Sequence, residues 1–343
     1  MAAGSYRIGI AAVVLALVAP SPSGLQRRLA GASSAQPKRA APPAGPATPR
    51  SAVTSRQLKP PRPADKPPKP PAKPAKKPPK KPRRRPSPFP PQTKGLLQQF
   101  LRAEMSDVEE IVFAARQPGR DGHWYANFGY YACDERRKVY GTGGKLYKLN
   151  LRSGKLTTLL ADPQGGIRDP QVHYDAGKVL FSWRKGGTDC YNLYEIGIDG
   201  DPKSLRRITS GPWDDIEPAY LPDGGIVFCS SRCNRWVNCW LTPVAVLYRC
   251  EANGSGVRML SSNNEHDNTP WPMPDGRVLY TRWEYVDRSQ VHYHHLWAMN
   301  PDGTGQMVYF GNLHGGTTMI DAKPIPGTDK VVACFSPGHG RRE

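Results

Sequence analysis

The sequence predicts an all-β fold, a β-propeller of four-stranded blades, preceded by a long Pro/Lys-rich tether and one short helix. Two observations predict the propeller. Strand-like runs of apolar, β-branched and aromatic residues recur with spacings of 47, 54 and 49 residues. Gly- and Asp-rich turns separate these runs throughout the repeated part, which excludes a helical repeat of the same length.

Four series of runs define the strands of each blade, named a to d from the axis outward. The b series comprises IVFAAR (111–116), KVLFSWR (178–184), GIVFCSSR (225–232), RVLYTRW (277–283) and KVVACF (330–335). The c series is LYKLN, LYEIG, LYRCE and LWAMN, starting at residues 146, 193, 247 and 296. Runs such as KLTTLL and QMVYF follow as strand d, and RDPQV (168), DDIEP (214), HDNTP (266) and IDAKP (320) open the next blade as strand a.

The propeller body is therefore assigned to residues 110–343, with about five blades visible. A propeller is stable when its first and last blades meet, because each blade buries its faces against its neighbours. We expect six or more blades in a complete ring and regard the body as truncated at its C-terminal end.

The N-terminal third predicts export. Residues 1–32 hold a single early base, Arg7, and an apolar run, Ile8–Ala19, that suits a signal peptide. The run is shorter than the roughly 20 residues of a membrane span. Cleavage and retention of residues 8–19 as a membrane anchor both stay open, and the expected location is the periplasm or cell envelope.

Residues 33–92 read as a disordered, basic Pro/Lys-rich linker, because they lack the apolar residues of a core. Leu96, Leu97, Phe100 and Leu101 then predict an amphipathic helix over residues 93–109.

The net charge of +19 belongs entirely to the N-terminal part. Residues 1–95 contain 20 of the 48 Lys and Arg residues and one acid, Asp65, whereas residues 96–343 contain 28 bases and 28 acids. The body therefore gives no electrostatic reason to expect nucleic acid as a partner. The tether is expected to be a solvated spacer or to contact an anionic envelope surface.

The b–c and d–a connections of a propeller lie on one face, hereafter the b–c face, and most of the reactive side chains map to it. We expect an envelope protein or a small ligand to bind there. The candidate ligand-binding residues are His266, Asp267, His292, His294, His314, Asp169, Asp215 and Asp321. The four aspartates are taken as equivalent positions at the heads of the a strands, where they cap turns, contact the next blade or form a carboxylate ring.

Two groups on this face are candidates for a metal site or a disulfide. His292 and His294 project to the same side of an extended segment, and a rim residue such as Cys233 could complete a metal site. Cys233 and Cys239 are the alternative disulfide pair in an exported protein with seven cysteines. Solvated or hydrogen-bonded histidines are the plainer alternative to metal ligation.

Catalytic residues and cofactors stay unknown at this stage. The sequence has no GxSxG elbow, no complete phosphate loop and no CxxCH motif for covalent haem attachment. This favours a binding protein over an enzyme for the chain by itself.

A family resemblance adds a second reading. The segments DGHWYANFGYYA (121–132), RDPQVHYDAGKVLFSWRKGG (168–187), SGPWDDIEPAYLPDGGIVFCSSRCNRWVNCW (210–240), EHDNTPWPMPDGRVLYTRWEYVDRSQVHYHHLWAMNPDGTG (265–305) and MIDAKPIPGTDK (319–330) carry it. They resemble planctomycete proteins with the hydrazine synthase alpha-subunit middle domain, and the PDG turns and LY strands resemble TolB-like propellers. The resemblance implies a propeller from a multihaem enzyme that makes hydrazine, so the alternative function is the propeller part of a metal- or haem-dependent redox enzyme whose cofactor-bearing parts are absent from this chain.

Overall fold

The structure is a computed structural model that describes residues 16–17, 95–102, 108–117, 130–131, 134–138, 140–188, 190–239, 242–285, 293–312 and 317–336. The predicted linker over residues 33–92 and most of the predicted signal segment lie outside these residues. None of the helices in the described part has the length and apolar character of a membrane span. Among the described residues, α1 runs over Leu96–Phe100, within the predicted helix of residues 93–109.

The sheets confirm the predicted β-propeller. Blade I contains β1 (Ala16–Leu17), β2 (Glu110–Ala115), β5 (Gly144–Asn150) and β6 (Leu156–Asp162). Blade II contains β7 (Gly166–Val172), β8 (Lys178–Arg184), β9 (Asn192–Gly197) and β10 (Arg206–Arg207). Blade III contains β11 (Asp215–Tyr220), β12 (Ile226–Ser230), β13 (Val246–Cys250) and β14 (Arg258–Met259).

Blade IV contains β15 (Asp267–Pro272), β16 (Val278–Trp283), β17 (Tyr293–Met299) and β18 (Met307–Phe310). Two strands of blade V follow, β19 (Thr317–Pro324) and β20 (Val331–Ser336). The a–b, b–c and c–d pairs of blades I to IV and the a–b pair of blade V are antiparallel. A small ribbon of β3 (Tyr130–Tyr131) and β4 (Asp134–Lys138) lies in the first b–c connection.

Cross-strand aromatic pairs explain the sequence repeat. An aromatic residue of strand b faces an aromatic residue of strand c in each of the first four blades, and such pairs stabilise a sheet more than their buried area alone. The pairs are Phe113 with Tyr147, Phe181 with Tyr194, Phe228 with Tyr248 and Tyr280 with Trp297. The repeated IVF and LY patterns thus encode one packing unit per blade.

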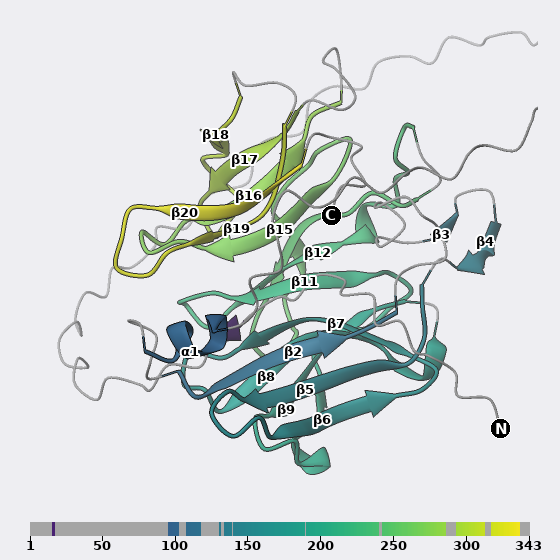
Figure 1. Ribbon diagram of the computed structural model, residues 1–343. Helices are drawn as coiled ribbons and strands as arrows, with labels where there is room; N and C mark the ends of the chain where they lie inside the picture. Colours follow the sequence, from purple (N-terminus) through teal and green to yellow (C-terminus); the bar gives the residue numbers. More distant parts are fainter. Residues whose placement is uncertain are drawn as a thin grey trace, which may run out of the picture. The chain divides into compact units, whose positions relative to one another are not determined.

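The apolar core lies between neighbouring blades. One cluster joins blades I and II, a second joins blades II, III and IV, and a third joins blades IV and V. The a strands of neighbouring blades pack against one another, and β11 contacts both β7 and β15 (Figure 1). Gly224 and Gly276 have φ angles of 86° and 87° in the PDG turns between strands a and b, a conformation that favours glycine.

A β-bulge interrupts strand a of blades II to V at the same place. The pairing with strand b shifts after Arg168, Ile216, Asn268 and Ile320. The next residue has a positive φ in each case: Asp169 (56°), Glu217 (53°), Thr269 (50°) and Asp321 (55°). Proline follows it in blades II, III and IV, which suits a bulge because proline has no N–H for the ladder. The bulges therefore hold four non-glycine residues in a strained conformation on the innermost strands.

Candidate functional site

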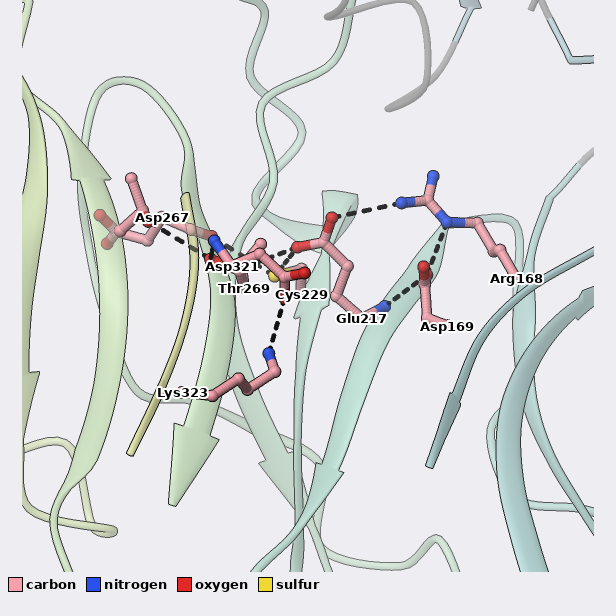
Figure 2. A network of polar contacts seen from close by, with 9 residues as sticks. Arg168, Asp169, Glu217, Cys229, Asp267, Thr269, Asp321 and Lys323 are labelled. Carbon is pink, nitrogen blue, oxygen red and sulfur yellow. Dashed lines mark hydrogen bonds and ion pairs between the residues drawn. The ribbon is translucent and has the colours of Figure 1, made fainter. Parts of the chain in front are cut away.

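The bulge residues are linked from blade to blade by a repeated hydrogen bond. The Glu217 N–H donates to Asp169 Oδ2 at 3.0 Å, and the Thr269 N–H donates to Glu217 Oε2 at 2.7 Å. The Asp321 N–H donates in the same way to Thr269 Oγ1 at 3.2 Å. We call Asp169, Glu217, Thr269 and Asp321 the inter-blade relay (Figure 2). Each relay side chain accepts from the strained backbone of the next blade, so the relay fixes neighbouring a strands against one another.

Charged side chains surround the relay. Arg168 donates through Nε to Asp169 Oδ2 at 2.5 Å and through a terminal nitrogen to Glu217 Oε1 at 3.2 Å. Lys323 pairs with Asp321 at 2.7 Å at the other end (Figure 2). Burial would lower the pKa of Arg168, but the adjacent carboxylates outweigh burial and raise it. Arg168 therefore stays a cation, held against two carboxylates.

Glu217 and Cys229 form the buried middle of the network. Burial raises the pKa of Glu217, and the Arg168 charge opposes that shift. The Cys229 thiol donates to Glu217 Oε2 at 3.4 Å. Its pKa lies well above the ordinary value because it is buried and faces this carboxylate. A thiol with a raised pKa is a poor nucleophile, so Cys229 serves here as a hydrogen-bond donor.

The predicted set of four equivalent aspartates divides into two groups. Asp169 and Asp321 are relay residues at the bulge, whereas Asp215 and Asp267 lie two residues before the bulge of their blades. The residues that match Asp169 in blades III and IV are Glu217 and Thr269. The correct alignment follows the bulge and its proline rather than the first acidic residue of each repeat.

Asp215 and Asp267 pair with an arginine of their own blade. Asp267 accepts from Nε and a terminal nitrogen of Arg282, both at 2.9 Å, and its side chain is fully buried. Asp215 pairs with Arg232 in the same manner. Burial raises the pKa of Asp215, and the Arg232 charge opposes this shift. These two carboxylates are occupied and form no open cation-binding ring.

Three histidines of the described part, His266, His294 and His295, are buried in the body, whereas His173 is partly exposed. His294 lies within β17 rather than in the preceding connection, is 2% exposed and stacks on Trp283 at 4.9 Å. Trp283 is its cross-strand neighbour, which explains the stacking. His266 Nδ1 accepts from the Ala245 N–H at 3.1 Å, and burial lowers its pKa to about 3, so His266 is neutral. His292 and His314 lie outside the described residues.

The candidate metal and disulfide groups are not assembled in the described part of the chain. No group of three or more His, Cys, Asp or Glu side chains able to hold a metal ion occurs among those residues. Cys233 and Cys239 are both free, so the predicted disulfide is not formed. The Cys233 thiol donates instead to the Val244 carbonyl at 3.3 Å, while Cys239 is exposed in the loop.

Two further carboxyl groups near the b–c face have strongly raised pKa values. Burial raises the pKa of Asp214 to about 7, although it accepts from the Tyr191 N–H at 2.8 Å and from the Tyr140 hydroxyl at 2.9 Å. Burial also raises the pKa of Glu265 to about 7. Both groups precede an a strand and change charge near neutral pH, and groups with such shifts gather at functional sites.

The candidate site residues predicted from the sequence do not include Arg116, Arg168, Glu217 or Asp214. A signal for two of them is present, because the residue before proline in the a strands of blades II to IV varies among Asp, Glu and Thr while the proline stays. Comparing the repeats by their prolines would have pointed to Glu217, and to Arg168 beside Asp169.

The bulged inner strands and the repeated four-stranded sheets define the class of the protein as a β-propeller. Its fold is similar to that of hydrazine synthase from Kuenenia stuttgartiensis, with a TM-score of 0.52 and 18% sequence identity. The match covers 67% of this chain and 36% of that chain, so this chain corresponds to about a third of it. The resemblance expected from the sequence is thus found in the structure at the level of fold.

Two other solved structures have lower TM-scores. TolB from Acinetobacter baumannii gives a TM-score of 0.39 at 15% identity, covering 58% of this chain and 40% of that one. The β-propeller domain of the Trilobed protease from Pyrococcus furiosus gives 0.40 at 13% identity, covering 67% and 61%. No protein-family model and no curated protein matches the sequence.

Proposed function

We propose that this protein is an exported β-propeller scaffold of the cell envelope that binds a ligand or protein partner on its b–c face. The inter-blade relay is the observation that carries the proposal. Its residues sit in strained backbone close to the b–c ends of the a strands, and a buried ion pair lies beside them. Strain and buried charge of this kind cluster at binding and catalytic sites.

The N-terminal sequence supports the proposed location. An apolar run of signal-peptide length stands first, and a basic Pro/Lys-rich segment follows it. In this proposal the segment from residue 33 to 92 sets the reach of the propeller from the membrane or contacts anionic envelope polymer.

A pair of photo-crosslinking positions tests the face. Asn238 is an exposed residue of a b–c connection, and Asn253 is an exposed residue of a c–d turn on the opposite face. The full chain, with a photoreactive residue at one position or the other, is irradiated in intact cells and fractionated. We expect the protein in the envelope fraction and crosslinked products from position 238 only. Equal products from both positions, or protein confined to the cytoplasm, would contradict the proposal.

The second candidate is a part of a redox enzyme of hydrazine synthase type, favoured by the shared fold. The similarity at 18% identity concerns the fold, so this candidate needs chemical evidence of its own. Metal analysis and a haem absorption spectrum of the purified chain supply it. Stoichiometric zinc, iron or copper that is lost on His292→Ala would favour the enzyme, and a metal-free, haem-free protein would favour the scaffold.

A further inference from the structure

Arg116 lies where the first b–c connection begins, directly after β2, and β2 packs against β7. Ala115 pairs with Lys145 on β5 (Gly144–Asn150), and the Gly144 N–H donates to the Gly165 carbonyl at 3.1 Å, directly before β7. Arg116 therefore lies beside the start of β7, which carries Arg168, and the charges of Arg168, Asp169 and Glu217 act on it. It is only partly exposed, yet among the described residues no hydrogen bond or ion pair of Arg116 occurs. An arginine has five N–H donors, and leaving them without partners on a side chain that is largely withdrawn from water is costly.

The nearby carboxylates are already engaged. Asp169 Oδ2 accepts from Arg168 and from the Glu217 N–H. Glu217 uses one oxygen for Arg168 and the other for the Thr269 N–H and the Cys229 thiol. These contacts serve the inter-blade relay, so moving either carboxylate to Arg116 would break it.

Arg116 also stands beside a second cation. Burial is the main cause that lowers the pKa of Arg116, and the charge of Arg168 lowers it further. The carboxylates of Asp169 and Glu217 act in the opposite direction. Two neighbouring arginines with one of them uncontacted attract an anion. The Arg116 guanidinium can bind a planar or tetrahedral oxyanion through two parallel N–H bonds. Arg168 is engaged by Asp169 and Glu217, so it contributes its positive charge rather than a second two-point contact.

We propose that Arg116 and Arg168 form an anion-binding site near the propeller axis, at the b–c face, which takes a carboxylate or phosphate group of the ligand. Tyr191 lies under Arg168, with the guanidinium carbon 5.9 Å from the ring centre. This aromatic support orients the guanidinium without using its N–H donors. The inference rests on the proposed function, in which the ligand binds on this face.

Thermal unfolding of the full chain tests the site, with inorganic phosphate exchanged against chloride at constant ionic strength. Wild type is compared with Arg116→Gln, and with Arg258→Gln as a matched control on an exposed arginine of a d strand. An anion that binds only the folded protein raises the Tm, by about 5 °C near saturation. We expect this rise in wild type and in Arg258→Gln, and its loss in Arg116→Gln.

The Tm in chloride, without phosphate, distinguishes a ligand-binding arginine from one that stabilises the fold. If Arg116 serves to bind an anion, Arg116→Gln has the same Tm as wild type in chloride or a higher one. If Arg116 instead stabilises the fold, the substitution lowers the Tm in chloride and all three proteins respond equally to phosphate, which overturns the proposal. Arg116→Lys keeps the charge without the two-point geometry, and we expect it to retain only part of the phosphate effect.

The same titration with succinate identifies the anion class. A rise with phosphate alone assigns the site to a phosphate group, and a rise with both assigns it to oxyanions in general. No rise in wild type with either anion overturns the site. Such a failure would leave the scaffold proposal intact if crosslinking from position 238 persists, whereas anion binding without selective crosslinking would retain the site and overturn the scaffold.

Discussion

Asp215 and Glu217 lie two residues apart on β11, yet they hold different parts of the molecule together. Asp215 pairs with Arg232 on its own blade, and Asp267 pairs with Arg282 in the same way. Glu217 accepts the backbone N–H of Thr269 on the next blade and is itself linked through its N–H to Asp169 on the previous one. The acidic residue two positions before the bulge therefore stabilises the sheet of its own blade. The bulge residue stabilises the contact between neighbouring blades.

This difference shows how a propeller separates two tasks along one strand. The carboxylate of the ion pair within a blade is fully buried, and donor and acceptor belong to the same blade. The relay contact forms only when two blades have docked, because donor and acceptor belong to different sheets. Breaking the two kinds of contact should thus produce effects of different size and reach.

Arg282→Met should produce the largest effect. It leaves the fully buried carboxylate of Asp267 without its cation, and breaking such a pair costs about 3–5 kcal/mol in the free energy of unfolding. Urea unfolding measures the loss. Arg277→Met is the control, because the Arg277–Asp275 pair is partly exposed and contributes about 1 kcal/mol or less. If both variants lose the same free energy of unfolding, the buried carboxylate of Asp267 does not need Arg282 as its partner.

Asp214→Asn should change how stability depends on pH. The pKa of Asp214 rises from an ordinary 3.8 to about 7 in the folded protein, so the folded state keeps a proton that the unfolded chain has lost. Stability therefore falls as the pH rises from 4 to 7, by at most about 1.4 kcal/mol per pH unit. The variant cannot titrate and should lose this slope.

The control for this measurement is Asp302→Asn. Asp302 accepts from Thr304 in an exposed turn, and that contact lowers its pKa below the ordinary 3.8, away from the window. Unfolding curves at several pH values should show the wild-type slope in this control. A wild-type slope in Asp214→Asn as well would mean that another group takes up the proton.

Thr269→Val should have the smallest effect on stability. Valine keeps the branched shape at this strained position but removes the hydroxyl that accepts the Asp321 N–H. The loss of one such bond costs about 1 kcal/mol in the free energy of unfolding. Thr269→Ser retains the acceptor and should stay close to wild type in the same urea titration. If both variants lose the same amount, packing of the Thr269 methyl group, rather than the relay, accounts for the change.

The fold was predictable from the sequence because the aromatic pairs between strands b and c repeat in the first four blades. Phe181 with Tyr194 and Phe228 with Tyr248 are visible as IVF-type and LY-type runs that recur once per blade. The pattern of side chains along a strand has a period of two, so these runs also fix which face is buried.

The site was only partly predictable, because a bulge shifts the register within strand a. The runs RDPQV and DDIEP can be aligned by their aspartates or by their prolines, and the aspartates place Asp215 opposite Asp169. The structure follows the prolines and places Glu217 there. Arg116 ends the first b run as Arg184 ends the second, but the repeat does not show which residues of strand a lie beside it. Only the folded chain brings it near Arg168.

Amide hydrogen exchange of Asp321 tests the relay most directly. In wild type and Thr269→Ser the Asp321 amide donates to the hydroxyl of residue 269 and should exchange slowly. In Thr269→Val its exchange should become at least about fivefold faster, while the Glu217 amide, held by Asp169, stays unchanged. An Asp321 amide that exchanges equally in all three proteins would contradict a relay that joins the blades.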